Sequence, residues 1–98
     1  ADWTPKFKRA VWKTDATSTD WHTAKNWSTV NVPTADVHVL IPTGASNYPT
    51  ITGSNAVCNN LTIYSSATLT LNSSYSLTIS GDFKNMGTAT ISGDMIIQ

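Results

Sequence analysis

The sequence predicts an all-β fold, specifically a short β-solenoid with a tryptophan-rich N-terminal cap, and it leaves a β-sandwich open as the alternative. Two observations lead to this prediction: the composition is rich in strand formers, and short apolar segments recur at a constant interval in the second half of the chain. The 98 residues suffice for one domain with a single hydrophobic core. Within it we expect an N-terminal arm over residues 1–11, a cap region rich in Trp and Pro over 12–55, and a β-repeat region over 56–98.

The composition favours strands over helices. Threonine (16), serine (11) and asparagine (8) are abundant, glutamate is absent, and the only glutamine is Gln98. Charged residues make up 12%, about half of the usual share of roughly 25%. Because good helix formers are scarce and β-branched residues are plentiful, strands are expected along most of the chain.

The N-terminal segment 1–29 differs from the rest of the chain. It contains five of the six cations and all four tryptophans, which are Trp3, Trp12, Trp21 and Trp27. Prolines at positions 33, 42 and 49 follow, and each marks the end or edge of a strand because proline cannot donate to a ladder. Residues 37–41, between the first two, are expected to form a short buried strand in which His38 faces solvent.

The most informative pattern is a repeat in the second half. Apolar-Thr-apolar triplets begin at Leu61, Leu69 and Leu77, a constant interval of eight positions, and Ser or Asn residues separate them. Each triplet places two apolar side chains on one face of a strand and a threonine on the other. The segment 78–82 also recurs as 90–94, with the sequence Thr-Ile-Ser-Gly-Asp in both.

The turns between these triplets favour a solenoid over a hairpin meander. Two-residue hairpins prefer Asn-Gly, Asp-Gly or Gly-X, and no glycine lies between the triplets. Ser and Asn corners at a short, strict period suit coils in which like residues stack from one coil to the next. A sandwich with longer links remains the alternative.

The four tryptophans allow two interpretations. Exposed indoles could stack on sugar rings, which makes Trp3, Trp12, Trp21 and Trp27 candidate carbohydrate-binding residues. Alternatively, Trp12, Trp21 and Trp27 close one end of the core as a cap, and the sequence favours this second interpretation. Trp3 lies in the polar arm and is the least suited of the four to a core.

Other functional classes find little support in the sequence. Zero net charge without a basic run argues against nucleic acid, and no apolar stretch is long enough to insert into a membrane. No catalytic, cofactor-binding or metal-ligating group is predicted, since neither the aspartates nor the two histidines show a recognisable spacing. Asp82 and Asp94 are interpreted as turn residues. The single cysteine, Cys58, is expected to pack as a small buried hydrophobe, an intermolecular disulfide being the alternative.

The C-terminal strand suggests an assembly surface. The chain ends in an apolar segment without a polar tail or a capping element, which would leave a strand edge and the end of the core open to another chain. Either these residues are one piece of a longer protein, or the open end is an assembly surface, in which case head-to-tail addition would build a filament. In such a filament the arm would complete a neighbouring sheet by β-augmentation. The candidate interface residues are Phe7, Val11, Met95, Ile96 and Ile97.

A run of motifs resembles a segment of large secreted surface and adhesin proteins of Bacteroidetes type. Its first part consists of Trp12, Ser18-Thr19-Asp20-Trp21, Thr23-Ala24, Asn26-Trp27-Ser28, Val32-Pro33 and residues 37–42. Its second part consists of Asn47-Tyr48-Pro49, residues 58–63 and 67–71, Leu77-Thr78-Ile79, Gly81-Asp82-Phe83, Asn85 and Gly87-Thr88. One departure is Lys13, where such segments usually have glycine.

The resemblance implies an extracellular, cell-surface β-module whose tryptophan segment is the cap. We therefore expect a non-enzymatic structural or adhesive module that needs no cofactor and associates with itself or with neighbouring domains. A polysaccharide or a host or cell surface is a further candidate partner. The alternatives are a carbohydrate-binding module using exposed tryptophans and, as a third possibility, a fragment of a β-helix hydrolase or lyase.

Overall fold

The computed structural model describes residues 8–98, which form ten short strands and one 3-10 helix. In chain order these are β1 (Lys8–Val11), η1 (Ala24–Asn26), β2 (Val37–Ile41), β3 (Thr50–Ile51), β4 (Ala56–Cys58), β5 (Leu61–Ile63), β6 (Thr68–Leu71), β7 (Ser76–Ile79), β8 (Phe83–Asn85), β9 (Thr88–Ile91) and β10 (Asp94–Ile97). The expectation of an all-β fold is confirmed, since no α-helix occurs over residues 8–98.

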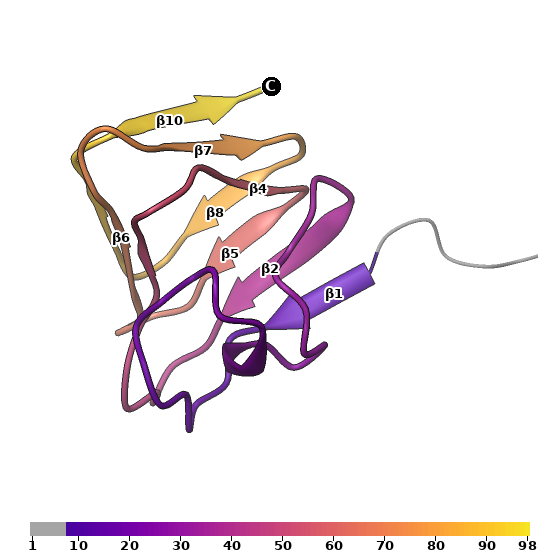
Figure 1. Cartoon of the computed structure of the whole chain (residues 1–98), viewed down its shortest axis with the longest axis vertical. Coiled ribbons are helices and arrows are strands. Elements are labelled where there is room, and N and C mark those ends of the chain that lie inside the picture. Colours follow the sequence, from indigo (N-terminus) through magenta and orange to yellow (C-terminus); the bar gives the residue numbers. More distant parts are fainter. Residues whose placement is uncertain (1–7) are drawn as a thin grey trace, which may run out of the picture.

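The strands form three parallel sheets. Their strand orders are β1-β2-β5-β8, β10-β7-β4 and β3-β6-β9, and in Figure 1 the sheets lie on different sides of a roughly triangular cross-section. From β2 onward the chain visits the three sheets in turn, so partners within one sheet are distant in sequence. For example, Val39 pairs with Leu61 and Leu61 with Phe83, and the chain passes through the other two sheets between one partner and the next.

The three predicted triplets lie in three different sheets. Leu61 is in β5, Leu69 in β6 and Leu77 in β7, and each of these strands has parallel neighbours. Among the named strands over residues 8–98, every pairing is parallel, so the triplets do not pair with one another as hairpins.

The core follows from the alternation along each strand. In β2, β5, β6 and β7 the apolar residues are mostly buried and the residues between them half-buried. Parallel register stacks like on like, as where Ile51, Leu71 and Ile91 occupy equivalent positions in β3, β6 and β9. The predicted buried strand at 37–41 is confirmed as β2. Its His38 is half-buried on the outer side, where Nδ1 accepts a hydrogen bond from the backbone amide of Asn60 at 3.3 Å.

Glycine at the corners of the last strands permits close contact with the strands beneath. A β-carbon on Gly93 would lie 2.2 Å from the carbonyl oxygen of Tyr75, and one on Gly87 would lie 2.4 Å from that of Ala67. The equivalent corners of the preceding strands use Ser66 and Ser74 in the left-handed conformation, with φ of 66° and 77°. Glycine is therefore needed here for space, because these two corners pack directly on backbone.

Candidate functional site

One end of the core is closed by three tryptophans. Trp12, Trp21 and Trp27 are 0% exposed. The ring of Trp27 packs edge-on against both others, with centroid distances of 5.2 Å to Trp12 and 4.8 Å to Trp21. Such edge-to-face pairs add roughly 0.5–1.5 kcal/mol each to the contribution of burial. The cluster therefore closes this end as a packed aromatic layer.

Hydrogen bonds hold two of the three indoles. Nε1 of Trp12 donates to the carbonyl oxygen of Asn47 at 2.7 Å, and Nε1 of Trp27 donates to that of Trp21 at 2.8 Å. Among the described residues, Nε1 of Trp21 has no partner although it is buried. Positioning of the cluster therefore depends on the backbone carbonyl groups of Asn47 and Trp21 as well as on packing.

A polar turn builds the backbone that carries these indoles. The carboxylate of Asp20 accepts hydrogen bonds from the amide of His22 and from the hydroxyl of Thr23. Asn26 is 1% exposed, and its side-chain amide donates to Ser18 Oγ at 2.9 Å and to the carbonyl of Asp20 at 3.0 Å. The polar residues of the motif Ser-Thr-Asp-Trp and of the downstream Asn-Trp thus stabilise the backbone turn that carries the indoles.

Trp12, Trp21 and Trp27 do not form an exposed sugar-binding platform. A stacking platform needs an accessible ring face, and burial removes Trp12, Trp21 and Trp27 from solvent. Trp3, the fourth candidate, lies outside the described residues. Of the two interpretations that the sequence allows, the buried cap is the one that fits these three positions.

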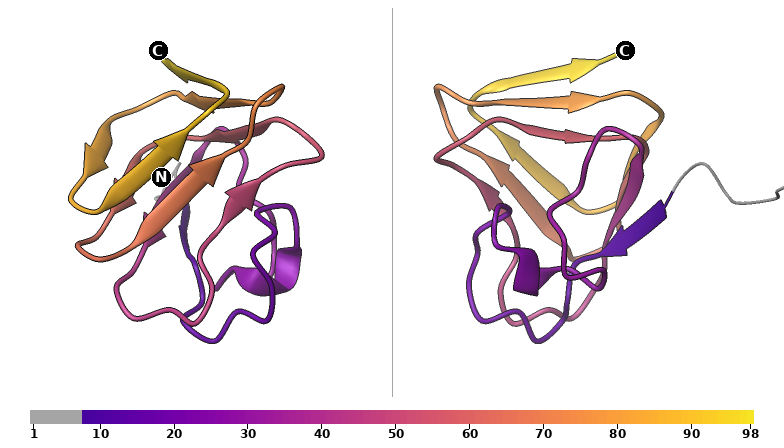
Figure 2. Two further views of the ribbon diagram at one scale, coloured as in Figure 1. Left: turned by 90° about the vertical axis from the view of Figure 1, so that its left-hand side faces the viewer. Right: turned by 45° about the vertical axis from the view of Figure 1, so that its right-hand side comes forward.

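The opposite end of the core is open. Strands β8, β9 and β10 are each at the edge of their sheet, and Figure 2 shows them following one another at this end. Ile97 is 56% exposed although its partner Ile79 is fully buried, and Ile91 is 37% exposed above the buried Leu71. Inward-facing apolar side chains here lack the covering layer that buries their equivalents one strand below.

The predicted assembly residues are placed differently from one another. Met95 and Ile97 face the open core, whereas Ile96, in register with Thr78, is on the outer face. Val11 is half-buried at the other end of the molecule, and Phe7 lies outside the described residues. The four described residues of this set therefore do not form one surface.

The last part of the predicted arm belongs to the chain's own sheet. Residues 8–11 form β1, which pairs in parallel with β2, and the amide of Val11 donates to Ser28 Oγ at 3.0 Å. Residues 8–11 of the predicted arm therefore do not extend from the domain but form the edge strand of the chain's own sheet. The local pattern does not reveal this pairing because the partner strand lies beyond the whole tryptophan segment.

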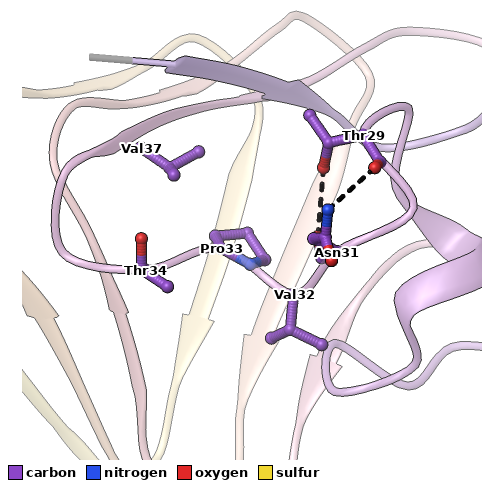
Figure 3. A pocket seen from close by; sticks show the side chains of 6 residues that line it. All are labelled: Thr29, Asn31, Val32, Pro33, Thr34 and Val37. Atoms are coloured by element: carbon purple, nitrogen blue, oxygen red, sulfur yellow. Dashed lines mark hydrogen bonds between the residues drawn. The ribbon is translucent and has the colours of Figure 1, made fainter. Parts of the chain in front are cut away.

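Two shallow pockets lie near the capped end. One, of about 350 Å³, is lined by Thr29, Asn31, Val32, Pro33, Thr34 and Val37 (Figure 3). In it Thr29 Oγ1 donates to the carbonyl of Asn31, and the Asn31 amide donates back to the carbonyl of Thr29, both at 3.1 Å. The other, of about 330 Å³, is lined by residues 11–15, Ser28 and Pro42. Neither pocket is evident from the sequence, in which Pro33 and Pro42 indicate only strand ends.

The first pocket has no charged lining residue. Its polar groups are threonine hydroxyls and one amide, and two of these residues are hydrogen-bonded to each other. Lining of this kind offers no acid, base or nucleophile activated by a neighbour. We therefore do not regard it as a catalytic centre.

The single cysteine of the chain does not form a reactive site. Cys58 is a free, fully buried thiol, and desolvation by burial raises its pKa from 9.0 to about 12. A thiol of this kind is protonated and inert at neutral pH. The expectation that Cys58 packs as a buried hydrophobe is thus confirmed. Within residues 8–98, no cluster of three or more His, Cys, Asp or Glu side chains could hold a metal ion. Nor does any helix in that range have the length and apolarity to cross a membrane.

These features define an all-β domain of three parallel sheets, closed at one end by tryptophans and open at the other. The profile of a domain of unknown function, DUF8693, matches residues 11–97. The chain therefore belongs to the DUF8693 family. No curated protein and no solved structure matches it.

Proposed function

We propose that this domain is a non-enzymatic structural and adhesive module of an extracellular bacterial surface protein, built as a short β-solenoid and associating through its open end. The parallel order of the three sheets supports the solenoid, because successive strands contribute one side each and equivalent residues stack. The resemblance of its tryptophan and repeat motifs to Bacteroidetes-type surface proteins supports the location. The open end is the observation that carries the proposed association.

The open end has the chemistry of a contact surface. Edge strands present unpaired amide and carbonyl groups, which can template pairing with another chain. Met95 and Ile97 add apolar area above the core, and burying one such side chain contributes roughly 1.5–3 kcal/mol. Hydrogen bonding and apolar burial are thus available together at one surface.

The capped end does not offer a matching surface. The amide of Thr50 in β3 donates to the carbonyl of Thr19, and the amide of Trp21 donates to the carbonyl of Thr50. In β1, the amide of Val11 donates to Ser28 Oγ, and the carbonyl of Val11 accepts a hydrogen bond from the amide of Ser28. A filament needs two complementary ends, whereas here one end is largely satisfied internally. We therefore propose that two copies pair through their like open ends, which gives a closed symmetric dimer.

Ile97→Lys tests this association. It places a charge in the proposed dry contact, so we expect the dissociation constant of the dimer to rise more than tenfold, or about 1.4 kcal/mol. The readout is sedimentation equilibrium of the chain over a range of concentrations, with circular dichroism to verify folding. Ile96→Lys is the matched control, because Ile96 is in the same strand and 45% exposed but faces outward. It should dimerise like the unmodified chain.

Three outcomes would overturn the proposal of a closed pair. They are a monomer at all concentrations, equal effects of the two lysine substitutions, and filaments in electron micrographs of the unmodified chain. A filament would show that the capped end also takes part in assembly.

A further inference from the structure

The outer face of the β3-β6-β9 sheet carries a grid of threonines. Register places Thr50, Thr70 and Thr90 in one column across the three strands. Thr68 and Thr88 form a second column two residues earlier along β6 and β9. The left view of Figure 2 looks onto this sheet, whose three strands run side by side. Five hydroxyl groups are thus arranged in two dimensions on one face.

Strand geometry fixes the spacing of this grid. Adjacent strands lie about 4.7–4.9 Å apart, and residues i and i+2 on one strand are roughly 6.6 Å apart, at about 3.3 Å per residue. Threonine is stiff at χ1 because it is β-branched, so each hydroxyl and methyl holds its position. The side-chain hydrogen bonds of threonine over residues 8–98 involve other positions, and none joins a grid hydroxyl to another described residue. The grid hydroxyls can therefore bind solvent in a regular pattern.

The other two outer faces differ in chemistry. The outward positions of β1 and β8 include the cations Arg9 and Lys84, in register with His38 and Thr62 respectively. On the β10-β7-β4 sheet, Val57 and Ile96 flank Thr78 and are 38% and 45% exposed. Only the threonine grid is uniformly small, uncharged and hydroxylated among the described strands. The three outer faces of the domain therefore differ in charge and in apolar exposure.

From these observations we propose that the threonine grid adsorbs to ice. The spacing between strands is close to the oxygen repeat along the a axis of hexagonal ice, and the spacing along each strand is somewhat shorter than the repeat along its c axis. Hydroxyls at these spacings hold water by hydrogen bonds, while methyl groups between them restrict the orientation of first-shell water. Because the five grid side chains are uncharged and stiff at χ1, water can take lattice positions between them without competition from ionic hydration.

The same face is poorly suited to other partners. The five grid positions include no aromatic ring for stacking on sugars and no charge. Asp20, in register with Thr50 at the edge of the grid, has its carboxylate hydrogen-bonded to His22 and Thr23. Both pockets lie elsewhere, at residues 11–15, 28–37 and 42. An isolated hydroxyl gains little from one hydrogen bond because water competes with its partner. A repeating lattice is the ligand that uses many such groups in register at once.

Partition of the chain into slowly growing ice tests this inference. We expect the unmodified chain to be enriched in the ice relative to serum albumin, and Thr70→Lys or Thr90→Lys to reduce that enrichment at least tenfold. Thr62→Lys and Thr78→Lys are the matched controls, because both are half-buried outward threonines of the same turn of the chain, but on the other two sheets. They should retain full enrichment.

The measurement is decisive in each direction. Exclusion of the unmodified chain from ice, or an equal loss in the grid and control variants, would overturn the proposal. If the unmodified chain sediments with microcrystalline cellulose and Thr70→Lys abolishes this binding, the grid binds polysaccharide, and the proposal of ice adsorption is likewise overturned. Circular dichroism and thermal melting establish that each variant is folded. Because the grid lies on a side of the molecule and Ile97 at its end, failure here leaves the proposed dimer untouched.

Discussion

At the residue scale, the three buried indoles are not equivalent. They share complete burial, but only Trp12 and Trp27 donate hydrogen bonds from Nε1. The buried Nε1 of Trp21 has no described partner and so bears the cost of desolvation without compensation. Replacing each ring by one without the N–H group separates packing from hydrogen bonding.

We expect Trp27→Phe to destabilise the domain more than Trp21→Phe, by about 1–3 kcal/mol, because only the first leaves a buried carbonyl oxygen unpaired. Both substitutions remove a similar volume from a fully buried position. The difference in unfolding free energy from urea denaturation, followed by circular dichroism, measures the effect. Equal losses would show that packing alone determines the stability of the cluster.

Cys58 links stability to alkaline pH. Burial raises the pKa of its thiol to about 12 in the folded chain, compared with 9.0 ordinarily. Between these values the unfolded chain releases the proton and the folded chain retains it. The unfolding free energy should therefore fall as pH rises above 9, by at most about 1.4 kcal/mol per pH unit. Below pH 9 this contribution is fully present and constant.

Cys58→Ala separates this effect from the titration of tyrosines and lysines. We expect the stability advantage of the unmodified chain over the alanine variant to shrink steadily from pH 9 to pH 11. Urea denaturation under reducing conditions at several pH values measures it. Parallel pH profiles for the two proteins would contradict the assigned cause.

At the element scale, the corners determine how closely successive strands stack. Gly93 joins β9 to β10 over the carbonyl oxygen of Tyr75. The amide of Asp94 also donates to that same oxygen at 3.0 Å. Any side chain at position 93 would therefore disturb the hydrogen bond that begins the last strand.

Gly93→Ala should reduce the unfolding free energy by about 1–3 kcal/mol, the usual cost of overpacking a tight site. Ser92→Ala is the neighbouring control, and as an exposed substitution it should remain within about 0.5 kcal/mol. Thermal and urea unfolding of both variants measure the difference. A neutral Gly93→Ala would indicate that β10 can move away from β7 without cost.

Local periodicity predicts some of these elements well and others poorly. The strands at 37–41, 61–63, 68–71 and 76–79 can be predicted because alternation and burial coincide there. Strand β1 is not visible because its pairing depends on a distant partner, and β3 is too short, at two residues, for alternation to register. Burial of the tryptophans follows from their position before the apolar strands, whereas the pocket at 29–37 arises from loop packing that no local pattern encodes.

At the scale of the whole molecule, the two ends differ in how completely their backbone groups are used. At one end, the polar turn around Asp20 supplies hydrogen-bond partners and the indole layer covers the core. At the other end, edge strands keep unpaired backbone groups and apolar side chains stay exposed. The threonine grid occupies a side face and shares no residue with either the indole layer or the proposed contact at Met95 and Ile97. Assembly and surface adsorption, as proposed here, can therefore operate at the same time.

The distance in sequence between paired strands also affects how the domain opens. Each pairing of β8, β9 or β10 closes a long loop, which costs entropy that only an already formed neighbour can offset. Order should therefore spread from the tryptophan end, as expected when each layer contacts only its neighbours. In the reverse direction, the last three strands should detach first while the indole layer stays intact. Local opening at that end would briefly expose the next apolar layer, so that contact with a second copy would also protect the domain against unravelling.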